Sequence, residues 1–483
     1  PQEAVEKLMQ AYRLSPESAE IQTQLVTIYG ARRDWPNAGD VANSWAQLEP
    51  ENPKAQLVLG WCSLMNHESL DATVILKPVC QKAPQDIEAH NIYGIALLEQ
   101  RKFDDAQKQF EAALALDAQY LPARLNLIAL YGFKGQNAYA LELIEKLQLQ
   151  EPENSCVLSL HAWLEMKLGN FDEANNLNCL AMSHDLQEPL ALICGGIIFR
   201  KQGKLDESAA LLQKAIKLFP DSPLPLYELS ATCVAQGKNT QAIETAQLAL
   251  QIAPSNLDAK AALALALIAA KNYEGAIPLL KECVLRNPKD LQLRMVLSRA
   301  QVSRGDKEIA QTTLEKARTA FPDRAEPLIG LADLAFDFRN YRQSEQLLQE
   351  ALVCNPDNHE ALLSLARTNF AMGKFDSCLD QFDTLQSADL QPKDVLLKAR
   401  CEYALRQFSQ SCADYEKVMH SKSILDSADF VNYAQALLQS GQYVRAQELI
   451  SSIESNPTIM KNASSHELGR IQAEIRNCMR RTH

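Results

Sequence analysis

The side chains that could carry chemistry in this chain are acidic pairs, histidines and a glycine doublet. Asp104-Asp105 and Asp172-Glu173 offer the groups of a general acid and base, and eight histidines could bind a metal ion. No histidine belongs to a metalloprotease-type zinc motif or to a close His/Cys pair with metal-ligand spacing. The glycine motifs that bind nucleotide phosphates and the glycine-flanked serine of hydrolases are also absent. The sequence therefore predicts a protein without catalytic residues, metal ion or cofactor.

These features have structural explanations. The acidic pairs stand where the second helix of a helical hairpin is expected to begin, and carboxylates stabilise the positive end of a helix. His90 and His161 fall on inward-facing helical positions, which is typical of a hydrogen-bonded structural histidine. Gly195-Gly196 lies in the middle of an expected helix, at a position where most repeats have a small residue, so we interpret it as packing.

The helices that position these residues are expected to repeat every 34 residues. Prolines recur at intervals of 34 or 68 residues, and Ala118 and Leu186 occupy the two skipped positions. The periodic prolines are Pro16, Pro50, Pro84, Pro152, Pro220, Pro254, Pro288, Pro322 and Pro356. Between them, apolar residues recur at steps of three and four, which indicates helices. A fixed period of this length predicts a solenoid of helical repeats.

A small residue stands at the twentieth position of every unit, where two helices are expected to cross closely. These residues are Ala38, Ala72, Ala106, Ala140, Ala174, Ser208, Ala242, Ala276, Ala310, Ser344, Cys378, Ser411 and Ala446. In the unit 86–118 the first helix carries Tyr93, Gly94 and Leu97, and the second carries Phe103 and Phe110. This pattern resembles the tetratricopeptide repeat (TPR) family. The resemblance implies an all-α, right-handed α-solenoid of tandem helix-turn-helix units.

The repeat register predicts three segments. Residues 1–18 match the second helix of a truncated repeat, residues 19–458 hold thirteen consecutive repeats, and residues 459–483 form a C-terminal capping helix. The truncated first repeat leads us to expect that the native protein extends further toward its N-terminus. Pro78 falls inside an expected second helix, so we expect a kink or a broken turn there. Since each repeat of a solenoid contacts only its neighbours, we expect stability to be a sum of local contributions.

Composition narrows the partners and the compartment. Lys and Arg number 48 against 60 Asp and Glu, and this net charge of −12 argues against nucleic acid as a partner. The longest apolar run, residues 261–270, is too short to insert into a membrane. Twelve cysteines without a Cys-x-x-Cys pair favour a reducing compartment, which we take as the cytoplasm; the periplasm is the less favoured alternative.

The resemblance implies that the first helices line a concave groove that binds a protein or peptide. The candidate groove residues are Trp61, Met65, Asn91, Ile95, Asn126, Trp163, Lys167, Arg200 and Lys201. Tryptophan, methionine and isoleucine suit an apolar peptide or helix, and the three cations form a small basic group. The alternative is that Trp61 and Trp163 are ordinary core residues and that the three cations are simply solvated.

These observations favour a non-enzymatic scaffold that holds polypeptide partners in a largely apolar groove and organises a multiprotein complex. Self-association through the solenoid ends is an additional expectation. One alternative is the substrate-recruiting arm of a larger enzyme. Another is a TPR component of an envelope assembly for polysaccharide or pilus export.

Overall fold

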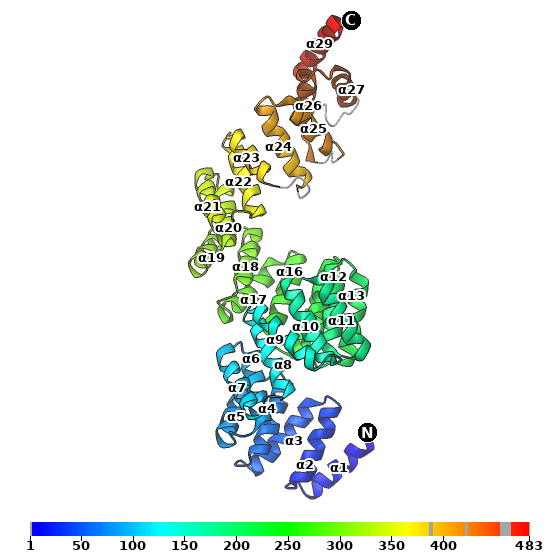
Figure 1. Cartoon of the computed structure of the whole chain (residues 1–483), viewed down its shortest axis with the longest axis vertical. Helices are drawn as coiled ribbons and strands as arrows, with labels where there is room; N and C mark the ends of the chain where they lie inside the picture. Colours follow the sequence, from blue (N-terminus) through cyan, green and yellow to red (C-terminus); the bar gives the residue numbers. More distant parts are fainter. Residues whose placement is uncertain (1, 386–389, 421–423, 455–464, 483) are drawn as a thin grey trace. The chain divides into compact units, whose positions relative to one another are not determined.

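The computed structural model describes residues 2–385, 390–420, 424–454 and 465–482. Within these residues the regular elements are helices and there is no strand, so the predicted all-α fold is confirmed (Figure 1). The chain divides into two compact units, Pro1–Cys283 and Val284–His483. We call them unit 1 and unit 2 and describe each by itself.

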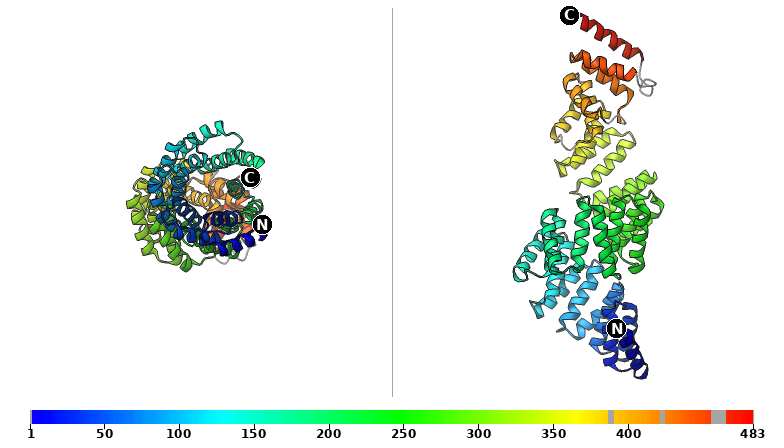
Figure 2. Two further views of the ribbon diagram at one scale, coloured as in Figure 1. Left: turned by 90° about the horizontal axis from the view of Figure 1, so that it is seen from below. Right: turned by 90° about the vertical axis from the view of Figure 1, so that its right-hand side faces the viewer.

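Unit 1 begins with α1 (Gln2–Leu14), which packs on α2, and continues as pairs of antiparallel helices. The first helices of these pairs are α2 (Ala19–Ala31), α4 (Pro53–Met65), α6 (Ile87–Glu99), α8 (Leu121–Phe133), α10 (Ser155–Leu168), α12 (Pro189–Lys201), α14 (Pro223–Ala235) and α16 (Leu257–Ala269). The second helices are α3 (Trp35–Leu48), α5 (Ser69–Lys82), α7 (Phe103–Leu116), α9 (Asn137–Gln150), α11 (Phe171–His184), α13 (Leu205–Leu218), α15 (Asn239–Ile252) and α17 (Tyr273–Arg286), in which the boundary between the units falls. These helices follow one another round a curved path (Figure 2).

Unit 2 repeats the same helical pair. Its first helices are α18 (Leu291–Arg304), α20 (Ala325–Asp337), α22 (His359–Ala371), α24 (Pro392–Ala404) and α26 (Ser427–Gln439). Its second helices are α19 (Lys307–Ala320), α21 (Tyr341–Cys354), α23 (Phe375–Thr384), α25 (Phe408–Val418) and α27 (Tyr443–Glu454), and α29 (Ser465–Thr482) follows them. The repeated pairs confirm the predicted α-solenoid.

The close helix crossing depends on small residues, as the sequence indicates. Ala106 at the twentieth position of its repeat is fully buried. Across the same repeat, a Cβ added to Gly94 would lie 2.5 Å from Cε1 of Phe110, so only glycine fits there. Asp86 caps the first helix of this repeat by accepting from the amide of Ala89 at 3.0 Å. Packing and local capping therefore specify the same hairpin.

A kink or a broken turn is expected at Pro78. The helix α5 (Ser69–Lys82) continues through Pro78, so the expected broken turn is wrong, while the kink stays a prediction.

The turns between the first and second helices adopt a left-handed backbone. Seven repeats place glycine at the residue with positive φ, as at Gly135 with φ of 78°. Three consecutive repeats of unit 1 instead place Arg33, His67 and Arg101 there, with φ of 57°, 62° and 58°. Such a backbone costs about 1–2 kcal/mol for a residue with a Cβ. We call this position the turn position.

The last helix covers the end of unit 2. Ile471 and Ile475 of α29 are 3% and 1% exposed, and they pack on an apolar cluster that includes Leu437, Ile450 and Ile453. This contact removes the apolar surface of the last helical pair from water, as a solenoid end requires. Residues 459–464 of the predicted capping segment lie outside the described residues.

Candidate functional site

The surface formed by the first helices of unit 1 carries an aromatic–lysine cluster, which we define as Phe133, Trp163 and Lys167. Phe133 ends α8, and its ring lies 5.1 Å from that of Trp163 on α10. Nζ of Lys167 lies 4.6 Å from the centre of the Trp163 ring and donates to the carbonyl of Gly132 at 3.1 Å. The ammonium of Lys167 therefore contacts the faces of two aromatic rings and one backbone carbonyl. No carboxylate of the described residues lies within ion-pairing distance of it.

The protein around Lys167 disfavours its charge. Desolvation lowers the pKa of Lys167, and the nearby charge of Arg101 lowers it further, while Asp258 acts in the opposite direction. Although the side chain of Lys167 is exposed, the surrounding protein thus partly desolvates its ammonium. A cation in this situation is stabilised by an additional anionic partner.

A pocket of about 620 Å³ opens on the next three first helices, α12, α14 and α16. Its wall is mostly apolar and includes Val234, Leu265 and Ile268, and Leu265 is 45% exposed. We call it the α12–α16 pocket. Because three consecutive first helices form it, an open apolar surface runs across repeats, which suits a polypeptide segment.

The polar rim of this pocket is already paired. Arg200 forms an ion pair of 2.7 Å with Glu228 and also donates to the Glu228 carbonyl at 2.9 Å. Desolvation raises the pKa of Tyr227 well above its ordinary value. Lys201 is exposed at the end of α12, with no ion pair in the described part of the chain. The three cations expected from the sequence therefore differ: Arg200 is neutralised, whereas Lys167 and Lys201 carry uncompensated charge.

The other expected groove residues lie nearer the start of unit 1. Nδ2 of Asn126 donates to Oδ1 of Asn91 at 2.9 Å, so this pair links α6 with α8 rather than offering two free amides. Trp61 and Ile95 are half-buried and pack on one apolar cluster with Leu57 and Leu64. These two residues have mainly core contacts.

Glu99 adds a carboxylate close to these residues, at the end of α6. It is exposed at the surface, yet protein surrounds it on most sides, and this desolvation raises the pKa of its carboxyl to about 7.

Sequence reasoning missed a set of contacts between distant repeats of unit 1, which lie next to Met65. Asp221 accepts from Nη1 of Arg33 and from Nε1 of Trp35, both at 2.7 Å, and its carbonyl lies 2.8 Å from Nε2 of His67. Met65 lines a pocket of about 260 Å³ beside these residues.

Two further contacts reinforce this junction. The guanidinium of Arg33 lies 4.7 Å from the centre of the Phe219 ring, and Arg101 forms an ion pair of 2.7 Å with Asp258. We call the contacts of Arg33, Trp35 and His67 with Asp221, together with Arg101–Asp258, the clasp. A partial signal was present in the sequence, because Arg33, His67 and Arg101 occupy the turn position where seven other repeats have glycine.

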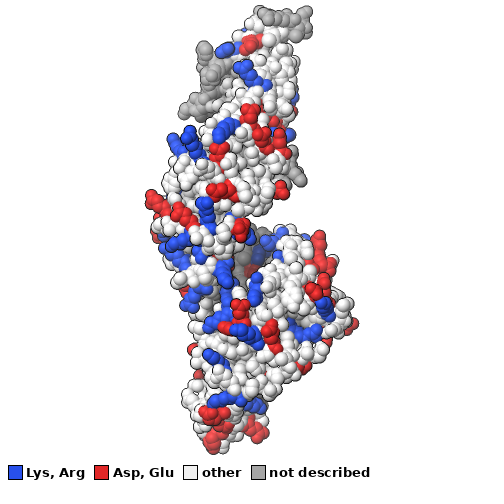
Figure 3. Space-filling view, turned by 60° about the vertical axis from the view of Figure 1, so that its left-hand side comes forward, with Lys and Arg blue, Asp and Glu red and all other residues white. Residues whose placement is uncertain are grey.

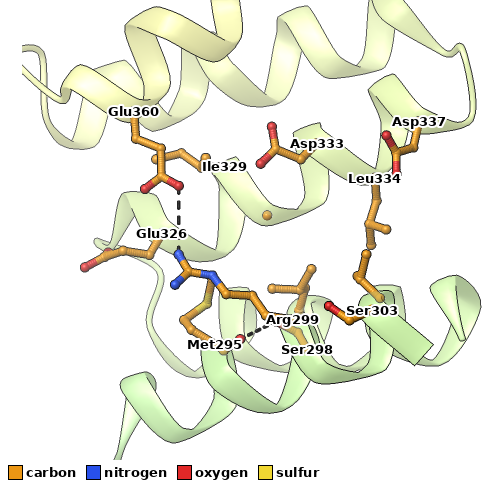
Figure 4. A pocket seen from close by; sticks show the side chains of 13 residues that line it. Met295, Ser298, Arg299, Ser303, Glu326, Ile329, Asp333, Leu334, Asp337 and Glu360 are labelled. Atoms are coloured by element: carbon orange, nitrogen blue, oxygen red, sulfur yellow. Dashed lines mark hydrogen bonds and ion pairs between the residues drawn. The ribbon is translucent and has the colours of Figure 1, made fainter. Parts of the chain in front are cut away.

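Unit 2 has a pocket of different character, with a volume of about 340 Å³ between α18, α20 and α22 (Figure 4). Met295 and Ile329 supply apolar walls, and Arg299 extends to Glu360 with 3.8 Å between Nη2 and Oε1 (Figure 4). Asp333 accepts from the hydroxyl of Ser364 at 3.1 Å, and desolvation raises the pKa of its carboxyl. The acidic lining distinguishes this pocket from the α12–α16 pocket.

The described residues offer no candidates for metal or membrane-spanning sites. They contain no group of three or more His, Cys, Asp or Glu side chains that could hold a metal ion. None of the described helices combines the length and the apolar character needed to cross a membrane. On the face shown in Figure 3, acidic and basic side chains are interspersed.

The helical pairs and their packing are those of a tetratricopeptide repeat protein. Tetratricopeptide repeat models match residues 97–164, 199–266, 234–300, 267–327 and 329–394, which together make up more than half of the chain. The chain therefore belongs to the tetratricopeptide repeat family, as its sequence pattern predicts.

Two relatives and one solved structure are similar to this chain. It is 26% identical to the BBSome complex member BBS4 of Bos taurus over 243 residues, 50% of this chain and 46% of BBS4. It is 23% identical to anaphase-promoting complex subunit 7 of Homo sapiens over 269 residues, 55% of this chain and 47% of that protein. The chain spans about half the length of these two relatives. A crystal structure of the APC/C hetero-tetramer Cut9–Hcn1 has the same fold, with a TM-score of 0.52, 13% identity and coverage of 97% of this chain and 92% of that one.

Proposed function

We propose that this protein is a scaffold that holds a polypeptide segment of a partner on the first helices of unit 1 and thereby organises a multiprotein complex. The observation that carries the proposal is an open apolar surface on consecutive first helices, formed by the aromatic–lysine cluster on α8 and α10 and by the α12–α16 pocket. Phe133 is 49% exposed and Leu265 is 45% exposed on this surface. Large apolar side chains left open to water along consecutive helices favour the docking of a partner.

The charges on this surface define the partner further. Lys167 has no carboxylate at ion-pairing distance in the described residues, and its surroundings penalise an uncompensated charge. A carboxylate on the partner next to an apolar side chain would pair with Lys167 while the apolar group contacts the α12–α16 pocket. The partner is therefore a segment that combines Asp or Glu with apolar residues.

The relatives support the same type of role. BBS4 and anaphase-promoting complex subunit 7 are, by their names, members of multiprotein complexes. We extend to this chain only the general role of a complex-forming subunit, and we propose that it acts without a catalytic site of its own. No disulfide joins two cysteines in the part of the chain that the structure describes, and this supports the further proposal that the protein works in a reducing compartment such as the cytoplasm.

The test compares two leucines with nearly the same exposure. Leu265 lines the α12–α16 pocket and is 45% exposed, whereas Leu248 lies on the second helix α15 and is 47% exposed. The unchanged chain, Leu265→Asp and Leu248→Asp are each used to select binders from a displayed library of random peptides. We expect Leu265→Asp to lose the peptides that the unchanged chain and Leu248→Asp retain. Equal retention by both variants, with unchanged circular dichroism, would show that the partner binds elsewhere.

A further inference from the structure

The clasp joins parts of unit 1 that a solenoid usually keeps apart. Arg33 and Asp221 are 188 positions apart in the sequence, and Arg101 and Asp258 are 157 apart. Three of the donors come from the turns of three consecutive repeats and the fourth, Trp35, begins α3, whereas the acceptors precede α14 or begin α16. The chain of unit 1 therefore curves back far enough for its first repeats to touch its later ones. We call the line of contact between them the seam.

The residues of the clasp occupy a position where their backbone is unfavourable. Arg33, His67 and Arg101 adopt a positive φ at the turn position, which glycine would adopt without strain. Lys271 has the same conformation, with φ of 61°, but its side chain is exposed and makes none of the clasp contacts. The contacts across the seam thus distinguish Arg33, His67 and Arg101 from another non-glycine residue at the same position.

The seam borders the surface proposed to bind the partner. Asp258 accepts from Arg101 at the seam and also lines the α12–α16 pocket. Arg101 is close enough to Lys167 to lower its pKa. Any polypeptide lying against Lys167 and Leu265 therefore lies beside the clasp.

We propose that the clasp closes unit 1 along the seam, so that its partner enters as a free polypeptide end and not as a loop. This inference rests on the proposed function, because it concerns access to that binding surface. A loop whose two ends are held in a folded domain can reach the surface only sideways, across the seam, which requires the contacts of Asp221 and Asp258 to break. A free end can slide in along the groove while those contacts remain.

The test uses glycine, the residue that other repeats already have at the turn position. The triple variant Arg33→Gly/His67→Gly/Arg101→Gly removes the donors of these turns and relieves backbone strain, so we expect it to fold. Lys271→Gly is the matched control, because it makes the same kind of change in unit 1 without touching the clasp. The probes are random peptides displayed either as free-ended tails or as loops within a folded carrier.

The expected result is a preference for tails that depends on the clasp. The unchanged chain and Lys271→Gly should select tails over loops by about tenfold, corresponding to about 1.4 kcal/mol, whereas the triple variant should select both. If the unchanged chain selects loops and tails equally, and this binding is lost in Leu265→Asp, the clasp proposal is wrong and the proposed function stands. If no selected peptide depends on Leu265, the proposed function is wrong.

The clasp also has a measurement that needs no partner. Amide hydrogen exchange of the full chain should increase around residues 219–222 and 256–260 in the triple variant, although these residues are unchanged. In Lys271→Gly the change should be confined to its own turn. Unchanged exchange at both distant segments in the triple variant would overturn the clasp whatever the binding experiment shows.

Discussion

The indole Nε1 of Trp35 donates a hydrogen bond of 2.7 Å to Oδ2 of Asp221, 186 residues further along the chain. The other carboxylate oxygen of Asp221 accepts from Arg33, and the side chain of Asp221 is only 17% exposed. The expectation that each repeat contacts only its neighbours is therefore wrong for unit 1. Its early and late repeats are coupled directly, and their stabilities should not be independent.

The first prediction concerns this coupling. Asp221→Ala leaves the guanidinium of Arg33 and the indole of Trp35 without their shared acceptor, which should destabilise unit 1 by about 1–3 kcal/mol in urea unfolding. Trp35→Phe removes one of the two donors. Because both changes break the same hydrogen bond, the double variant should lose less than the sum of the single losses. Additive losses would contradict a direct interaction between these residues.

The second prediction concerns the close crossing at Gly94. Alanine is the better helix former by about 1 kcal/mol, but its Cβ would lie 2.5 Å from Phe110. We expect Gly94→Ala to destabilise the protein by about 1–3 kcal/mol. Gly469 in α29 is the control, since a Cβ there meets no atom within 4 Å and Gly469→Ala should be neutral or stabilising. Thermal unfolding of both variants gives the comparison, and stabilisation by Gly94→Ala would show that the two helices have room for a Cβ at this crossing.

The third prediction concerns pH. Glu402 is 4% exposed, and desolvation, with a further contribution from Asp414, raises the pKa of its carboxyl from 4.5 to about 7. The folded state therefore holds this proton more tightly than the unfolded state, so its contribution to stability is present below about pH 4.5 and is lost as the pH rises through about 7.

Glu402→Gln should remove this pH dependence, because glutamine stays neutral. We expect the variant to be more stable than the unchanged chain by about 1–3 kcal/mol at pH 8 and to gain much less at pH 4.5. Urea unfolding across this range measures the difference, with the exposed Glu448→Gln as the control. If the stability gained by Glu402→Gln does not vary with pH, its cause is a change in packing and not the ionisation of Glu402.

The fourth prediction concerns the end of unit 2. Ile475 of α29 is 1% exposed and packs on the last helical pair, so Ile475→Ala should lower the local stability of this end by about 2–5 kcal/mol. Hydrogen exchange should rise in α26 and α27, with little change in α18–α21, because the cluster that includes Ile475 is confined to the last repeats. The exposed Glu474→Ala serves as the control. Uniform loss of protection throughout unit 2 would instead indicate a single cooperative unit.

The fifth prediction concerns Lys167. For peptides selected by the unchanged chain that contain Asp or Glu, Lys167→Met should weaken binding by about tenfold, because it removes the cation and keeps a chain of similar length. Lys201→Met is the control on a neighbouring first helix. Fluorescence anisotropy with each labelled peptide measures the affinity. Equal effects of the two variants would indicate general attraction between charges and not a specific contact at Lys167.

The sequence alone determined the repeat. Three patterns identify it: the proline spacing, the small residue at the twentieth position and the apolar residues at steps of three and four. Each pattern depends on contacts within one repeat or between two adjacent repeats. Because these contacts recur in every repeat, the residues that make them recur in the sequence at a fixed period. For the same reason the position of Lys167 on a first helix could be predicted. The pairing of Arg200 with Glu228 could not, because it depends on side-chain geometry between neighbouring helices.

Only the tertiary structure showed the contact between Asp221 and the turns at Arg33 and His67. The curvature of a solenoid accumulates from small rotations between many repeats, so which distant residues meet depends on the sum of all of them. Three donors are non-glycine residues at the turn position, but Lys271, Arg339 and Arg406 share that property without belonging to the clasp, and nothing in the sequence indicated the acceptors. The repeats and their order are thus encoded locally, whereas the clasp is a property of the whole of unit 1.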